Sequence, residues 1–222
     1  MAVFFESRID AARRLAKALA HYRGRNPLVL AIPRGAVPMG RVLADELEGD
    51  LDVVLVRKLR SPASSEFAVG SIDESGWAYV AEYAASAGAN HAYLEQEKRF
   101  QLEVLRKRRT QYTPRRAPID AKGRITIVVD DGLATGATMI AALHAARAKQ
   151  PAQLVCAVPV AAPGSLELVR SYADEVICLD APEGFFAVGQ FYGEFRQVDD
   201  EEVIALLAAE TGATQGSAGG AQ

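Results

Sequence analysis

Apolar and polar positions alternate along the chain in blocks that predict strand, loop and helix in repeated succession. Short apolar runs of strand length precede segments with apolar residues every three or four positions, the period of an amphipathic helix. Buried strands are predicted at 28–33, 51–56, 125–129, 154–160 and 176–179. Helices are predicted at 7–22, 37–47, 139–149, 163–172 and 199–209. Repeated units of this kind predict an α/β fold with a mainly parallel sheet, whose ligands bind at the carboxyl ends of the strands.

After the second buried strand the pattern changes. Residues 57–67 contain serines and a proline without a clear period, which predicts a mobile loop. Two short strands at 68–72 and 77–80 flank the turn Asp73-Glu74-Ser75-Gly76 and predict an antiparallel hairpin. A long, exposed amphipathic helix is expected at 90–112, where apolar residues alternate with many charges.

Length and composition fit one domain with a short tail. The chain has 222 residues, of which 50% are hydrophobic and 24% charged. A chain of this size buries enough surface to need no disulfide, so Cys156 and Cys178 are expected to be reduced strand residues. We expect the domain to span 1–209 with the charged helix 90–112 as an insertion. The tail 210–222 is rich in Gly, Ala and Ser and is predicted to be disordered.

Charge and segment composition exclude several classes. A net charge of −3 argues against a generally basic nucleic-acid binder. The first residues show no secretory signal, so a cytoplasmic protein is expected. The longest uncharged stretch, 150–166, contains three prolines and cannot form a membrane-spanning helix. The isolated histidines His21, His91 and His144 lack metal-ligand spacing, so no zinc site is expected.

The segment 125–139, ITIVVDDGLATGATM, carries the strongest chemical signal. Its apolar strand ends in two carboxylates, Asp130 and Asp131, before a loop of small residues that opens a helix. Small residues let backbone amides approach a phosphate, threonine hydroxyls can donate to it, and the helix N-terminus favours an anion. The carboxylates would repel that anion, so they are expected to accept hydrogen bonds from sugar hydroxyls. The loop residues are Gly132, Leu133, Ala134, Thr135, Gly136, Ala137 and Thr138.

Two other phosphate motifs are absent from the sequence. No Lys-Ser/Thr ending of a P-loop and no G-x-G-x-x-G after a strand occur, which argues against ATPase and dehydrogenase classes. An isolated Asp-Asp-Gly would indicate only a turn whose threonines cap a helix. The complete strand, acidic pair, small-residue loop and helix favour a phosphorylated ribose.

The residues VVDDGLATGATM resemble the signature of the type I phosphoribosyltransferases, which bind 5-phosphoribosyl 1-diphosphate (PRPP). The resemblance implies that Asp130 and Asp131 hold the ribose hydroxyls and that residues 132–138 surround the 5-phosphate. It also implies that family's fold, with a central mainly parallel sheet flanked by helices, a small hood and a flexible lid loop. The order of elements extends the resemblance from about residue 5 to 209.

A second match lies at Ile32-Pro33-Arg34-Gly35-Ala36, where this family places its diphosphate loop. The resemblance implies that Arg34 and Gly35 face the leaving diphosphate, and that the Pro33-Arg34 peptide is cis. Read alone, Pro-Arg-Gly would indicate a turn with a surface arginine.

The resemblance also places a lid at 59–67, preceded by Arg57 and Lys58, which could add positive charge near the diphosphate. Within this lid Glu66 is one hypothesis for the general base. The alternative for the two basic residues is a solvated strand end.

A hood is expected near 181–198, where aromatic residues are dense. Phe186-Ala187-Val188-Gly189 is similar to the F-V-V-G segment of hypoxanthine-guanine phosphoribosyltransferases, which implies that Phe186 and Val188 bind a base. Gly193 and Ala134 stand where those enzymes have aspartates, so the acceptor base stays open. Packing of the aromatic residues into the core is an equal alternative.

The resemblance implies a transferase that moves the 5-phosphoribosyl group from PRPP to a nitrogenous base, purine-like by preference, and releases diphosphate in nucleotide salvage. Its catalytic residues would be Arg34, Lys58, Asp130 and Asp131, with Mg²⁺ held mainly through PRPP and water near the two aspartates. One alternative is a non-catalytic sensor of PRPP or a nucleotide that contacts nucleic acid through the charged helix. A hydrolase or ligase of a phosphorylated sugar is a third reading. The charged helix also suits a homodimer contact.

Overall fold

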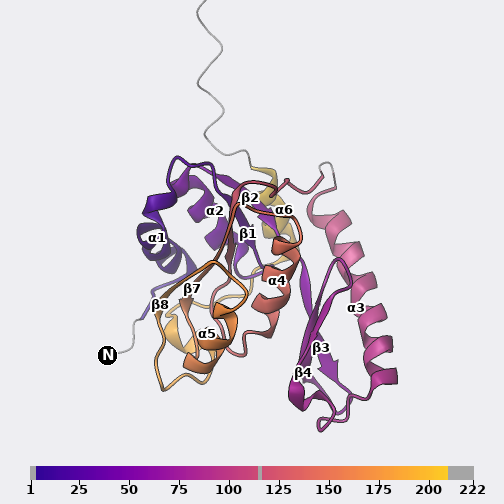
Figure 1. The fold of residues 1–222 in the computed structure, drawn as a ribbon. Helices are drawn as coiled ribbons and strands as arrows, with labels where there is room; N and C mark the ends of the chain where they lie inside the picture. The colour runs from indigo at the N-terminus through magenta and orange to yellow at the C-terminus, as the bar shows by residue number, and fades with distance from the viewer. Residues whose placement is uncertain (1–3, 115–116, 210–222) are drawn as a thin grey trace, which may run out of the picture.

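The computed structural model describes residues 4–114 and 117–209, without the side chains of residues 65 and 66. The disordered tail predicted at 210–222 and the Glu66 general base therefore lie outside the described residues. Within them, the main body is a parallel sheet of five strands in the order β2-β1-β6-β7-β8 (Figure 1). The strands are β1 Leu28–Ala31, β2 Asp50–Val53, β6 Ile125–Val129, β7 Gln153–Val160 and β8 Glu175–Asp180.

Helices cover both faces of this sheet, as the alternation of elements predicted. Its side chains divide by strand period into two cores, one with Val29, Ile127 and Val155 and the other with Leu30, Val128 and Cys156. The first core is closed by helices α1 Arg8–Ala18, α2 Val37–Leu47 and α6 Asp200–Ala208. The second core is closed by α4 Ala137–Arg147 and α5 Pro163–Arg170. Short 3₁₀ turns complete the chain at Ala20–Tyr22, Glu82–Ala84 and Val188–Phe191.

The strand order determines where a ligand can enter. β1 and β6 are neighbours in the sheet. The chain after β1 continues toward the edge formed by β2, whereas the chain after β6 continues toward β7 and β8 at the opposite edge. Loops that leave in opposite directions open a crevice at the carboxyl ends of those two strands. The diphosphate loop predicted at 32–36 and the phosphate loop predicted at 130–136 are these two loops.

A second, antiparallel sheet corrects the prediction of a mobile loop at 57–67. β3 Val56–Ser61 and β4 Ser64–Asp73 form a hairpin, and β5 Ala78–Val80 pairs with β4 as predicted. The predicted core strand 51–56 accordingly ends at Val53. This sheet packs between α4 on one face and α3 His91–Tyr112 on the other, beside the main body (Figure 1).

The strand signal in this hairpin is weak for a physical reason. Leu59 is the buried apolar residue of β3, between the exposed Lys58 and Arg60, and bulges on both sides of Arg60 interrupt the period of two. A single apolar position does not distinguish a strand from a loop.

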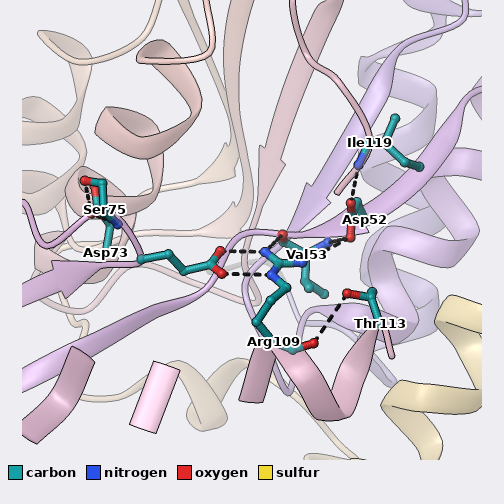
Figure 2. A network of polar contacts seen from close by, with 8 residues as sticks. Asp52, Val53, Asp73, Ser75, Arg109, Thr113 and Ile119 are labelled. Carbon is teal, nitrogen blue, oxygen red and sulfur yellow. Dashed lines mark hydrogen bonds and ion pairs between the residues drawn. The ribbon is translucent and has the colours of Figure 1, made fainter. Parts of the chain in front are cut away.

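A buried ion network joins the two sheets. Arg109 of α3 donates to both carboxylate oxygens of Glu74, in the turn between β4 and β5, and to the carbonyl of Val53 at the end of β2. Asp52 is 1% exposed, lies 3.6 Å from the Arg109 guanidinium, and accepts the amides of Val53 and Ile119 (Figure 2). The charged helix is thus partly structural, because one of its arginines clamps the hairpin sheet to the parallel sheet.

Across the described residues, none of the helices has the length and apolarity needed to cross a membrane. Cys156 and Cys178 lie in β7 and β8, as predicted, and are free thiols.

Candidate sugar-phosphate site

A cavity of about 190 Å³ opens at the carboxyl end of β6. The phosphate loop forms most of its wall, and Lys58 and Val188 approach it from the hairpin sheet and the hood. Its lining residues are Lys58, Asp130, Asp131, Gly132, Leu133, Ala134, Thr135, Gly136, Thr138, Met139 and Val188. The structure therefore brings both predicted carboxylates and nearly all of the predicted phosphate loop to one place.

The loop after β6 is held by contacts with the end of β7 and the start of α5. The amide of Leu133 donates to the carbonyl of Val160 in β7, and the Ser165 hydroxyl donates to the carbonyl of Ala134. Gly136 has a φ of +75°, which lets the loop turn into α4 one residue later. The first amides of α4 lack partners within the helix and can donate to a bound anion. The arrangement is a rigid cradle of the kind that binds phosphate.

Gly132 is required by a close approach. A Cβ built on it would lie 2.8 Å and 2.9 Å from the two terminal carbons of Val188. The hood therefore packs directly on the backbone of the phosphate loop, at a distance that only glycine allows.

The two carboxylates differ in their surroundings. Asp130 Oδ1 accepts the amide of Asp131 at 2.9 Å, whereas Asp131 Oδ2 binds the guanidinium of Arg8. Burial and the neighbouring Asp131 raise the pKa of Asp130 well above its usual range. Burial raises the pKa of Asp131 as well, and Arg8 opposes that effect. The guanidinium of Arg8 offsets part of the negative charge of the pair, which reduces its repulsion of a phosphate bound beside it.

Arg8 is a site residue that the sequence pattern did not indicate. It stands in the first turn of α1, after the N-cap Ser7. A cation at this end of a helix opposes the helix dipole. The unfavourable position of this positive charge is the one signal in the sequence that Arg8 has a partner outside its own helix.

Arg57 and Lys58 point to opposite faces of β3. Lys58 lines the cavity, whereas Arg57 donates to the side chain of Gln101 on α3 at 2.5 Å. Successive strand residues alternate in direction, so the two cannot act at the same place. The structure brings Lys58 to the carboxylates and directs Arg57 away from them.

The diphosphate loop lies next to the cavity without lining it. The Pro33-Arg34 peptide is cis, as the resemblance implied. The Arg34 guanidinium lies 3.9 Å from the carboxylate of Asp200, at the start of α6. Gly35 lies against Asp131, since a Cβ on it would be 2.5 Å from Asp131 Oδ2. The two loops of the crevice therefore meet at this carboxylate.

The aromatic residues of the hood fall into two groups. Phe191 and Tyr192 are buried in the core, as the packing alternative predicted, whereas Phe186 is 91% exposed. Gln190 fixes the loop below Phe186, because its side-chain oxygen accepts the amides of Phe186 and Ala187. The backbone at Phe186 is thus held in place while its ring is exposed, and Val188 is the hood residue that lines the cavity.

The carboxylates also have the donor chemistry that magnesium prefers. No cluster of three or more His, Cys, Asp or Glu side chains in the described part of the chain could hold a metal alone. Asp130 and Asp131 are the acidic residues lining the cavity, and Asp131 is already bound by Arg8. Mg²⁺ commonly takes one or two carboxylates together with water and substrate phosphate oxygens. Asp130 beside a phosphate cradle fits that donor set.

Comparison with known proteins agrees with this geometry. The family model described as phosphoribosyl transferase domain matches residues 6–193. Two Mycobacterium tuberculosis proteins, "Putative phosphoribosyl transferase MT0597" of strain CDC 1551 / Oshkosh and "Putative phosphoribosyl transferase Rv0571c" of strain ATCC 25618 / H37Rv, are each 41% identical over 204 residues. These matches cover 91% of this chain and 46% of each relative, so the chain spans about half the length of the curated relatives it matches.

A solved structure resembles the chain over almost its whole length. The crystal structure of TT1426 from Thermus thermophilus is 43% identical, with a TM-score of 0.78. The match covers 92% of this chain and 98% of that chain. The family match, the two relatives and the shared fold lead to one conclusion: the chain belongs to the phosphoribosyl transferase domain family.

Proposed function

We propose that this protein transfers the 5-phosphoribosyl group of PRPP to a nitrogenous base, purine-like by preference, with release of diphosphate. The observation that carries the proposal is the cavity in which two carboxylates and a small-residue phosphate cradle face Lys58. A 5-phosphorylated ribose has an anionic group for the cradle and neutral hydroxyls for the carboxylates.

The protein's contribution to this reaction would be orientation and electrostatics. The cradle at 132–138 would bind the 5-phosphate and place the sugar, while Asp130 and Asp131 would accept hydrogen bonds from its hydroxyls. Held in this way, the anomeric carbon faces an acceptor bound under the hood, which lowers the entropic cost of bringing the two together.

Departure of diphosphate builds negative charge that needs stabilisation. Lys58 lines the cavity, and Arg34 and Gly35 lie on the adjacent loop, so these residues would face the leaving group. Mg²⁺, held by PRPP, water and Asp130, would neutralise part of the same charge when bound. The bond from the anomeric carbon to the diphosphate breaks as the bond to the acceptor nitrogen forms, and the acceptor then loses its proton.

The preference for a flat base rests on Phe186. Gln190 holds the backbone below this exposed ring, so stacking would have to order only the side chain. A flat heterocycle gains roughly 1–3 kcal/mol by stacking on an aromatic ring. A purine offers the larger stacking surface.

The neighbouring residues Lys58 and Arg57 provide a matched test. Titration calorimetry with PRPP and Mg²⁺ should show binding by the unchanged protein, and Asp130→Asn/Asp131→Asn should abolish it. Lys58→Met should weaken binding roughly tenfold, because a charge-assisted phosphate contact is lost. Arg57→Met removes an equal charge from the opposite face of the strand and should change affinity by less than about twofold.

A screen for diphosphate release with purine and pyrimidine bases then tests the reaction. Release with one base identifies the acceptor. Binding of PRPP without release for any base would contradict the transferase proposal and support a sensor. Absence of binding by the folded protein would contradict both.

A further inference from the structure

Arg8 is the residue at which three separate parts of the site meet. Its Nε and Nη2 lie 2.8 Å and 2.7 Å from Asp131 Oδ2, and its Nη1 donates to the carbonyl of Arg196 at 2.7 Å. Its guanidinium lies 3.8 Å from the centre of the Phe195 ring. Gly35 completes the arrangement, since a Cβ there would come within 3.0 Å of Arg8 Nη2. The diphosphate loop, the hood and the acidic pair therefore all contact one side chain.

The direction of the ion pair determines which oxygen of Asp131 can serve a ligand. Both guanidinium contacts fall on Oδ2, so Oδ1 is the oxygen left for a ligand hydroxyl. The Arg8 and Asp131 side chains are only 12% and 16% exposed. A forked contact in such a site restricts rotation of the carboxylate, because turning it would break both contacts to a largely buried guanidinium.

The hood also contacts the backbone of Asp131. The Tyr192 hydroxyl donates to the Asp131 carbonyl at 2.6 Å, and the Tyr192 and Phe195 rings are 5.0 Å apart. The hood segment is also paired with the segment before α1, through hydrogen bonds from the Phe5 amide to the Phe191 carbonyl and from the Gly193 amide to the Phe5 carbonyl. The position of the hood and the orientation of the Asp131 carboxylate are thus linked through Arg8.

We propose that Arg8 is a positioning residue for the sugar half of the ligand, which orients Asp131 toward a ribose hydroxyl and couples that carboxylate to the hood. The proposal deepens the proposed function and rests on it. It assigns Arg8 no contact with the phosphate, so loss of Arg8 should affect recognition of the hydroxyls and leave the cradle intact.

Two probes separate these halves of the site: ribose 5-phosphate, which has the hydroxyls, and inorganic phosphate, which lacks them. Titration calorimetry of the full chain with each probe gives the preference for the sugar as a ratio of dissociation constants. Arg8→Met should reduce this ratio roughly tenfold, the cost of losing an oriented charge-assisted contact, while phosphate affinity changes by less than about twofold. Arg8→Lys should recover only part of the ratio, since an ammonium cannot reproduce the fork.

Arg14→Met is the matched control. Arg14 lies on the same helix and pairs with Asp10 at 2.8 Å, in a more exposed position that does not reach the cavity. Its substitution should leave the ratio unchanged. If Arg8 were only a structural residue, Arg8→Met would lower the melting temperature and weaken both probes equally, and the proposal would be wrong.

A second variant keeps the test decisive if Arg8→Met does not fold. Phe195→Leu removes the ring beneath the guanidinium without touching Asp131, and it should reduce the ratio in the same selective way. Where both variants fold, their double variant should lose less than the product of the two effects, because both act through one contact. Independent effects would contradict the coupling. If the unchanged protein does not prefer ribose 5-phosphate over phosphate, the proposed function itself is refuted. If the preference persists without Arg8, only the role of Arg8 is refuted.

Discussion

Removal of Arg109 is the sharpest test of how the two sheets are joined. Arg109→Met keeps the aliphatic part of the side chain and deletes its guanidinium. The substitution removes the cation that lies 3.6 Å from Asp52, which is 1% exposed, together with two hydrogen bonds to Glu74 and one to the Val53 carbonyl. The network in Figure 2 therefore loses its central member.

The magnitude follows from these surroundings. Breaking a buried ion pair by removing one partner typically costs about 3–5 kcal/mol. Two features place this site at the lower end. Asp52 retains the backbone amides of Val53 and Ile119 as donors, and Glu74 is 31% exposed, so water replaces part of its lost contact. We therefore expect the free energy of unfolding to fall by about 3 kcal/mol.

Urea unfolding followed by far-UV circular dichroism measures this loss. Arg106→Met is the control, because Arg106 is an exposed residue of the same helix, and its substitution should change the free energy of unfolding by less than about 0.5 kcal/mol. Arg109→Lys should retain little of the stability, since an ammonium cannot bind both oxygens of Glu74 and the Val53 carbonyl together. Equal losses for Arg109→Met and Arg106→Met would refute the clamp.

Three further predictions concern close contacts and one titration. Gly132→Ala should lower both thermal stability and PRPP affinity in calorimetry, because the added Cβ lies within 2.9 Å of Val188, and Val188→Ala should restore part of both. Gly70→Ala should cost about 3 kcal/mol in urea unfolding, since its Cβ would lie 2.2 Å from a carbonyl of β5 that cannot move aside. Burial and the hydrogen bond to Asp200 raise the pKa of Tyr112 from 10.0 to about 12. The native state keeps a proton that the unfolded chain releases, so stability should fall between about pH 10 and 12, and urea unfolding of Tyr112→Phe should show a smaller fall.

The sequence predicts the centre of the parallel sheet well because its strands β1, β6 and β7 are buried on both faces. Each of these three is a continuous apolar run followed by a helical period, and the helix predicted at 37–47 has the observed bounds. The hairpin sheet was predicted only in part. Its first strand has a single buried apolar residue, Leu59, and is stabilised by α3 and α4 on its two faces rather than by its own pattern.

The candidate site, like the fold, contains parts that the local sequence predicts and parts that it does not. Asp130, Asp131 and the small residues after them are consecutive, so local sequence contains nearly all of their arrangement. Arg8 precedes Asp131 by 123 positions and reaches it only because α1 and the end of β6 meet in the folded chain. The only local trace of this tertiary contact is a cation in the first turn of α1, which does not identify its partner. The direction of Arg57 depended on a strand that the pattern did not indicate.

The position of Lys58 follows from how the hairpin sheet is attached. Lys58 belongs to a different sheet from the phosphate loop, so its distance to the carboxylates depends on contacts between the two sheets. One such contact is the buried Ser71 hydroxyl of β4, which donates to the carbonyl of Ala137 at the start of α4 at 2.6 Å. Another is the Arg109 clamp on Glu74, which directly follows the last residue of β4. Two fixed points along a strand determine both its position and its direction. The geometry of the site therefore depends on the contacts that attach the hairpin sheet to the main body, so residues outside the cavity help to determine it.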